Sequence, residues 1–190
     1  MSVRVVAGTA RGRRLAVPAG QATRPTSDRV REAVFNALAS LDAIDGADVL
    51  DPFAGSGALA IEALSRGAAR ATLIESDRSA RAIIEANLAS CGLAEQASVV
   101  AGDALAHLAR TADQYDLVLL DPPYRYAGWA DLQRAVLAQL APDGVIVIES
   151  DQPVEVVPPL SVVREKRYGG TVVLFTRKSS GTAVHAGAHE

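Results

Sequence analysis

Carboxylates stand at the ends of short apolar runs in this sequence, and their repeated position suggests chemistry. Asp51 ends the run ADVLD, Glu75 ends ATLIE, Asp103 follows SVVAG, and Asp121 ends DLVLLD. In an open sheet of parallel strands the carboxyl ends lie at one edge, where ligands bind. The four side chains are therefore predicted to form an acidic rim, which attracts a cationic ligand and repels the pyrophosphate of a dinucleotide.

A glycine loop follows the first of these runs. The segment DPFAGSGALA places Gly55 and Gly57 between a predicted strand and a predicted helix. Glycine lets the backbone approach a ligand closely, and a helix N-terminus offers unpaired N–H groups. The spacing of the glycines also fits the fingerprint of dinucleotide-binding enzymes. Glu75 could bind the ribose hydroxyls of a dinucleotide or of a methyl-donor cofactor. The loop alone therefore leaves three interpretations open: a methyl-donor cofactor, a nicotinamide dinucleotide, or a tight turn without a ligand.

The element Asp121-Pro122-Pro123-Tyr124 ends a run that cannot continue as a strand. Methylation of an aromatic amine requires groups that accept its N–H bonds and turn its lone pair toward the methyl donor. Asp121 and the carbonyl of Pro122 are predicted to accept these bonds, the prolines to fix the turn, and Tyr124 to stack on the base. The alternative is an ordinary strand end with a Pro-Pro turn.

The acidic rim and this element together favour S-adenosylmethionine, which carries a sulfonium and an ammonium group. Glu75 would pair with its ribose hydroxyls, Asp103 with its adenine amine, and the loop from Asp51 to Gly57 with its amino-acid end. Transfer from a sulfonium has a neutral leaving group, so no metal is required. The candidate cofactor-binding residues are Asp51, Phe53, Gly55, Ser56, Gly57, Glu75, Asp103, Ala104 and Asp121.

Positive charge is concentrated at the N-terminus. Residues 1–31 hold seven arginines, no lysine and one acidic residue, whereas the whole chain has a net charge of −3. A basic arm on an acidic body suits a polyanion bound at one face, and guanidinium groups match phosphate geometry. A solvated charged hairpin is the alternative. The candidate residues for binding this polyanion, which the resemblance described below implies to be RNA, are Arg4, Arg11, Arg13, Arg14, Arg24, Arg29 and Arg31.

Two of these arginines break a local rule. Arg29 and Arg31 fall in the first turn of a helix predicted by SDRVREAVFNALASL, with Thr26 or Ser27 as its N-cap. The helix dipole disfavours positive charge at this end. We interpret the conflict as a weak sign of an anionic partner.

Periodicity predicts an α/β fold with a small β extension at the N-terminus. Alternation in VRVVA and RRLAV predicts a β-hairpin from about Val3 to Val17. From Gly46 onward, apolar runs alternate with helical segments, which is typical of a mostly parallel sheet with helices on both faces. The segment SVVREKRYGGTVVLFTRK predicts a closing antiparallel hairpin.

Composition bounds the size and setting of the protein. The chain has 190 residues, of which 49% are hydrophobic and 22% charged, as in one globular domain. It lacks a signal-peptide core and an apolar run of roughly 18 residues. The single cysteine, Cys91, cannot form a disulfide within the chain, and His185 and His189 lie in a small, polar tail. We expect a cytoplasmic monomer with no bound metal and no membrane contact.

The motifs resemble a known group of enzymes. DPFAGSG, IES and DPPY are similar to class I adenosylmethionine-dependent amino-methyltransferases, which implies a Rossmann-like fold. RVVAGTARGRRL followed by TRPTSDRVREAVFNAL resembles the RsmD family, bacterial methyltransferases of guanine N2 in 16S ribosomal RNA. The resemblance covers roughly residues 3–178 and differs mainly in a longer small-residue tail.

The resemblance also implies a substrate and a division of labour along the chain. The substrate would be one guanine in a loop of the small-subunit RNA, modified on an assembled or partly assembled ribosomal particle. We expect residues 1–25 to form a basic arm and loop that contacts this RNA, residues 26–178 to form the methyltransferase domain, and residues 179–190 to be disordered.

Other functions fit parts of the sequence. A DNA adenine or cytosine amino-methyltransferase shares the DPPY chemistry but needs an added domain to flip a base from a duplex. A protein glutamine methyltransferase has little use for the N-terminal arginines. A Rossmann oxidoreductase leaves Asp121 to Tyr124 unexplained, and a non-catalytic RNA-binding protein would transfer no methyl group.

Overall fold

The centre of the molecule is a single mixed sheet with one antiparallel end. The computed structural model describes residues 3–18, 28–123 and 125–179, and within them seven strands are ordered β5-β4-β3-β6-β7-β9-β8. Strands β3 to β7 pair in parallel, while β9 pairs antiparallel with both β7 and β8. The strands are β3 (Asp48–Asp51), β4 (Arg70–Glu75), β5 (Ala97–Ala101), β6 (Tyr115–Leu120), β7 (Leu140–Ser150), β8 (Leu160–Tyr168) and β9 (Thr171–Lys178). The predicted mostly parallel sheet with a closing antiparallel hairpin is confirmed.

Helices cover both faces of this sheet, as predicted. On β6, Leu117 and Leu119 pack with the residues of α1, α2 and α3, whereas Val118 and Leu120 pack with those of α4 and α5. Successive strand residues point to opposite faces, so an uninterrupted apolar run marks a strand that is buried on both. The helices are α1 (Asp28–Ala39), α2 (Ala58–Ser65), α3 (Arg78–Cys91), α4 (Ala104–Leu108) and α5 (Trp129–Gln139), with a 3-10 turn, η1, at Ala94–Gln96.

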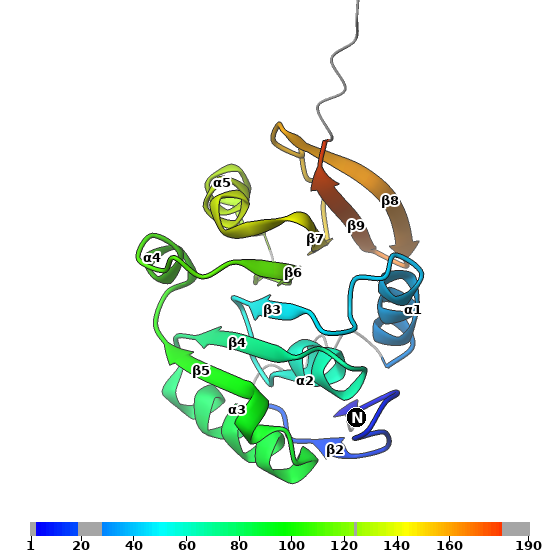
Figure 1. Cartoon of the computed structure of the whole chain (residues 1–190), viewed down its shortest axis with the longest axis vertical. Helices are drawn as coiled ribbons and strands as arrows, with labels where there is room; N and C mark the ends of the chain where they lie inside the picture. The colour runs from blue at the N-terminus through cyan, green and yellow to red at the C-terminus, as the bar shows by residue number, and fades with distance from the viewer. Residues whose placement is uncertain (1–2, 19–27, 124, 180–190) are drawn as a thin grey trace, which may run out of the picture.

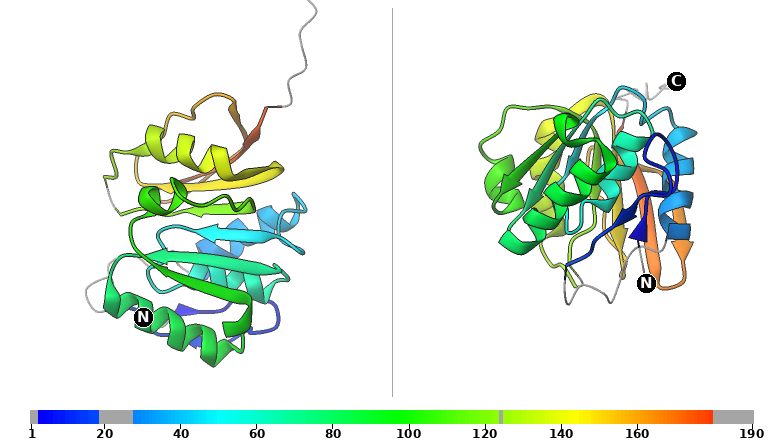
Figure 2. Two further views of the ribbon diagram at one scale, coloured as in Figure 1. Left: turned by 60° about the vertical axis from the view of Figure 1, so that its left-hand side comes forward. Right: turned by 90° about the horizontal axis from the view of Figure 1, so that it is seen from below.

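The ends of the molecule carry the two antiparallel hairpins. Figures 1 and 2 show the strands following one another along the long axis, with the blue N-terminal hairpin near α3 and the orange and red strands β8 and β9 at the other end. None of the described helices has the length and apolar character needed to cross a bilayer. Apart from Ser179, the tail predicted to be disordered lies outside the described residues, as do both predicted N-cap residues of α1.

The predicted N-terminal hairpin is present and is docked on the domain. β1 (Val3–Arg4) pairs antiparallel with β2 (Arg14–Leu15), so that Val3 lies opposite Leu15. Both side chains are buried in the same hydrophobic cluster as α2 and α3. The hairpin therefore shares the core of the sheet rather than extending into solvent.

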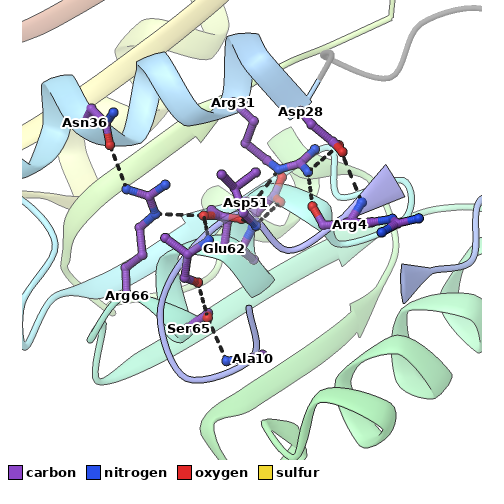
Figure 3. A network of polar contacts seen from close by, with 12 residues as sticks. Arg4, Ala10, Asp28, Arg31, Asn36, Asp51, Glu62, Ser65 and Arg66 are labelled. Carbon is purple, nitrogen blue, oxygen red and sulfur yellow. Dashed lines mark hydrogen bonds and ion pairs between the residues drawn. The ribbon is translucent and has the colours of Figure 1, made fainter. Parts of the chain in front are cut away.

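A buried carboxylate on α2 receives the hairpin. Glu62 has no exposed surface, and its Oε2 accepts a hydrogen bond from the backbone N–H of Val6 at 2.7 Å. Its Oε1 accepts bonds from the N–H of Ala7 at 3.0 Å and from Nε of Arg66 at 2.7 Å. Nε of Arg31 lies 3.6 Å from Oε2, and Figure 3 shows Arg31 and Arg66 directed at this carboxylate from two sides. A buried charge is tolerated only with such partners, so Glu62 fixes where the hairpin can dock.

We expect Glu62→Gln to lower the free energy of unfolding by about 3 kcal/mol, because an amide nitrogen would face groups that are themselves donors. Urea denaturation measures this loss. Glu165→Gln is the matched control, since the Glu165 carboxylate pairs with Arg167 in solvent and its removal should cost less than about 1 kcal/mol. Equal small losses in the two variants would contradict the role given to Glu62.

Candidate functional site

Four acidic side chains lie at one edge of the sheet. Asp51 and Glu75 end β3 and β4, Asp103 follows β5, and Asp121 directly follows β6. These four strands are parallel neighbours in the order β5-β4-β3-β6, so their carboxyl ends lie side by side. Strand order reverses between β3 and β6, the point at which open α/β sheets bind their ligands. Asp51 and Asp121 flank this point.

Asp51 is the most deeply buried of the four, with 1% of its surface exposed. Its pKa is raised from 3.8 to about 7, mainly by burial and to a smaller extent by the nearby charge of Glu75, while neighbouring backbone N–H groups act in the opposite direction. Its Oδ2 accepts a hydrogen bond from the N–H of Ala60 at 3.3 Å. This bond satisfies a backbone donor in the first turn of α2, where the N-cap residue, Gly57, has no side chain to accept it. Among the described residues, Oδ1 has no hydrogen-bond partner. A buried carboxylate oxygen without a partner fits a cationic hydrogen-bond donor.

The glycine loop is held in one shape by its neighbours. Gly55 donates its N–H to Oε2 of Glu75 at 2.9 Å, and Gly57 donates to the carbonyl of Ala54 at 2.6 Å. Gly57 has a φ of 77°, and a Cβ there would lie 3.3 Å from side-chain atoms of Leu73 and Ile84. Only glycine fits this position without strain. Glu75 therefore orients the loop in addition to any contact with a ligand.

The remaining candidate residues lie beside an aromatic group. Asp103 is exposed and caps α4 through the N–H of Ala106 at 2.9 Å, which places Ala104 in the first turn. Rings of Phe53 and Tyr126 meet edge to face at 5.6 Å, and Tyr126 meets Trp129 in the same way at 5.5 Å. Burial, followed by the charge of Asp103, raises the pKa of Tyr126. The loop after Asp121 is thus packed against the glycine loop.

Tyr124, one of the predicted catalytic residues, lies outside the described residues. Asp121 and Pro122 are partly buried and Pro123 is exposed, so the carboxylate and the turn stand at the surface of the sheet edge. In the part of the chain that the structure describes, no group of three His, Cys, Asp or Glu residues could hold a metal ion.

Five of the predicted RNA-binding arginines are exposed, and one is not. The exposed residues are Arg4, Arg11, Arg13, Arg14 and Arg29, while Arg24 lies outside the described residues.

The prediction for Arg31 is wrong. Its surface is 1% exposed, and its guanidinium contacts Glu62, the Asp28 carboxylate at 2.8 Å and the carbonyl of Arg4 (Figure 3). Two acidic partners compensate the positive charge in the first turn of α1, so this residue gives no sign of an anionic ligand.

Comparison with known proteins identifies the family. A family model described as conserved hypothetical protein 95 matches residues 3–177. Ribosomal RNA small subunit methyltransferase D from Escherichia coli strain K12 is 40% identical over 186 residues, which cover 94% of this chain and 92% of that protein. The chain belongs to the RsmD family.

Two further matches extend over the same length. YlbH from Bacillus subtilis, a proposed rRNA methyltransferase, is 37% identical over 184 residues. The match covers 93% of this chain and 99% of YlbH. A solved structure of YhhF from Escherichia coli, a proposed methyltransferase, has a TM-score of 0.83 and 39% identity, with 94% of this chain and 98% of that chain covered. The expected Rossmann-like class I methyltransferase fold, with its N-terminal hairpin, is therefore confirmed for this RsmD family member.

Sequence reasoning missed two polar residues that organise the site, Glu62 and Asn87. Each lies in a helix on a face that is otherwise apolar: Glu62 in ALAIEALS, and Asn87 in line with Ala80 and Ile84. A polar residue within an apolar stripe was the available signal, because such a group must find a buried partner.

We expect the fold to lose stability as the pH rises from about 4 to about 7, because folding raises the pKa of Asp51 to about 7. The folded state then binds a proton that the unfolded chain has released, so this contribution is complete at pH values below 3.8 and is lost as the pH passes about 7. Urea unfolding of the wild type and of Asp51→Asn at pH 5 and pH 8 measures this effect. Between these pH values, the free energy of unfolding of the variant relative to that of the wild type should rise by about 2 kcal/mol. The same shift in Asp116→Asn, at the exposed start of β6, would contradict this assignment.

Proposed function

We propose that this protein is an S-adenosylmethionine-dependent ribosomal RNA methyltransferase that acts on the small ribosomal subunit in the cytoplasm. It transfers a methyl group to the exocyclic N2 atom of one guanine in 16S RNA. The observation that carries the proposal is the buried, unpartnered Oδ1 of Asp51 beside the glycine loop at the switch in strand order. The ribosomal RNA methyltransferase from Escherichia coli that is 40% identical supports the RNA substrate, and the resemblance to the RsmD family supports guanine N2.

The residues at the sheet edge fit this cofactor. Oδ1 of Asp51 can accept a bond from the ammonium group, and an acidic rim suits the sulfonium. Glu75 takes the ribose hydroxyls with the lone pairs that Gly55 and Asp77 leave available, and Asp103 takes the adenine amine next to Ala104. Phe53 and Ser56 line the same loop. Bound adenosylmethionine supplies a methyl group made electrophilic by its positive sulfur.

Asp121 and the turn after it prepare the guanine amine. The amine lone pair is delocalised into the ring, and it becomes nucleophilic when both N–H bonds are held out of the ring plane. The Asp121 carboxylate accepts one N–H and the Pro122 carbonyl accepts the other. As the N–C bond forms, the nitrogen must release a proton, and the same carboxylate can take it. Pro122 and Pro123 restrict the backbone of the turn, and Tyr124 stacks on the base.

The hairpin supplies the RNA-binding surface. Arg11, Arg13 and Arg14 are exposed on it, and Arg4 lies on the paired strand. Arginine forks bind phosphate oxygens in pairs, so these side chains can hold the RNA backbone without reading its sequence. Arg29, in the first turn of α1, extends the proposed surface, and Arg24 is included in the proposal from the sequence alone.

The proposal is tested by transfer of labelled methyl groups from S-adenosylmethionine. The substrates are small ribosomal subunits that lack the modification, naked 16S RNA, and duplex DNA. We expect incorporation into ribosomal RNA and none into DNA. Adenosylmethionine binding without incorporation into any RNA would leave the cofactor assignment standing and overturn the substrate assignment.

Asp121→Ala should reduce methyl transfer at least about 100-fold, because it removes an acceptor that acts on the reacting amine. Asp116→Ala, at the opposite end of the same strand, is the matched control and should keep near wild-type activity. Single-turnover rates under saturating cofactor separate this effect from weaker cofactor binding. Near wild-type transfer by Asp121→Ala would show that this carboxylate has no catalytic role.

Reversal of Arg11 and Arg13 to glutamate should weaken RNA binding and reduce the slope of log affinity against log salt by about 0.7 to 0.9 for each phosphate group that the hairpin no longer neutralises. Cofactor affinity should stay within about two-fold of the wild type, since the sheet edge is unchanged. Reversal of Lys166 and Arg167, which are exposed on β8, changes the charge equally and should leave the salt slope unaltered. Equal effects of the two double variants would rule out a specific role for the hairpin.

A further inference from the structure

Asn87 is a buried amide on a helix face that is otherwise apolar. It is 3% exposed and lies on α3 in line with Ala80, Ile84 and Leu88, all buried. A primary amide in such a place costs free energy unless its polar atoms are bonded. The partners of Asn87 therefore explain why it is tolerated there.

The amide of Asn87 bonds two segments that are far apart in the sequence. Its Oδ1 accepts a bond from the N–H of Ala16 at 2.8 Å, and its Nδ2 donates to the carbonyl of Ala16 at 2.9 Å. The same Nδ2 donates to the carbonyl of Ser56, also at 2.9 Å. The side chain thus pairs with Ala16 in both directions, as a neighbouring strand would, and holds Ser56 at the same time.

These two partners belong to the two functional parts of the proposed enzyme. Ala16 directly follows β2, the strand that carries the exposed Arg14. Ser56 stands between Gly55 and Gly57 in the loop proposed to bind the cofactor. One planar group therefore joins the RNA-binding hairpin to the cofactor loop.

The geometry of the amide makes the two contacts interdependent. Both donated bonds come from one nitrogen, whose hydrogens lie in a fixed plane. Rotation of the amide to follow a displaced Ala16 would weaken its bond to Ser56. The peptide after Ser56 is fixed at its other atom as well, because Gly57 donates to Ala54 at 2.6 Å. A change at Ala16 is thus transmitted to the shape of the loop.

The rest of the hairpin has its own anchors. Thr9 donates its N–H to the Ser65 carbonyl at 2.8 Å, and Ala10 donates to Oγ of Ser65 at 3.0 Å. Val6 and Ala7 are held by Glu62. A variant of Asn87 therefore keeps the hairpin docked on α2 while its link to the glycine loop is broken.

We propose that Asn87 is a positioning residue that couples RNA binding at the hairpin to cofactor binding at the glycine loop. This inference rests on the proposed function. RNA that holds the hairpin in place stabilises the loop conformation that binds the cofactor, so each ligand tightens the binding of the other. The coupling is reciprocal by thermodynamic necessity.

The test measures the affinity for S-adenosylhomocysteine, which cannot react, with and without saturating small ribosomal subunits. In the wild type we expect the subunit to tighten this binding by at least about five-fold. Asn87→Asp keeps the acceptor for the Ala16 N–H but turns an oxygen toward the two carbonyls. It should reduce the coupling to less than about two-fold while the variant still binds both ligands separately.

Two further variants keep the test decisive. Asn87→Leu fills a similar volume without a buried charge, and it should lose the coupling in the same way if the aspartate variant does not fold. Asn36→Asp makes the same chemical change at the other asparagine of the chain, which is exposed on α1, and should retain the coupling.

The outcomes separate the inference from the proposed function. A wild type that methylates RNA and binds both ligands without coupling would overturn the role of Asn87 alone. Coupling that persists in Asn87→Asp and Asn87→Leu would do the same. A wild type that binds neither S-adenosylhomocysteine nor ribosomal RNA would overturn the proposed function, and the coupling with it.

Discussion

The buried carboxylate of Glu62 is the interaction on which the arrangement of hairpin and sheet depends. It has no exposed surface, so the hairpin must dock where its backbone N–H groups at Val6 and Ala7 reach that carboxylate. The same carboxylate forms ion pairs with Arg31 and Arg66, and it stands on α2, which begins at the glycine loop. One short helix therefore sets the distance between the basic surface and the sheet edge.

The sheet edge concentrates acidic groups where the topology brings four strand ends together. Repulsion among them is moderated because Asp51 is buried and its pKa is raised to about 7, while Glu75 is held by loop N–H groups. The free energy stored by burying Asp51 is recovered when a cation pairs with it, which favours a positively charged cofactor over a dinucleotide. An acidic edge and a basic hairpin on one small domain fit an enzyme that holds a cationic cofactor and a polyanionic substrate at separate surfaces.

Much of this fold was predictable from the sequence because its signals are local. Apolar runs such as Leu117 to Leu120 indicate strands buried on both faces, and strand-end carboxylates indicate the ligand edge. The errors and omissions involve partners distant in the chain. Arg31 has the local pattern of an exposed first-turn arginine, but it is buried next to Glu62, 31 residues later in the chain. Asn87 likewise acquires its role through Ala16, 71 residues earlier.

The most direct test of the central claim is the identity of the nucleoside formed when the enzyme acts on unmodified small ribosomal subunits. After incubation with S-adenosylmethionine, the 16S RNA would be digested to nucleosides and analysed by liquid chromatography and mass spectrometry. The account predicts N2-methylguanosine at close to one residue per particle, and none with the Asp121→Ala variant. A methylated adenosine or cytidine, or no methylated nucleoside at all, would contradict it.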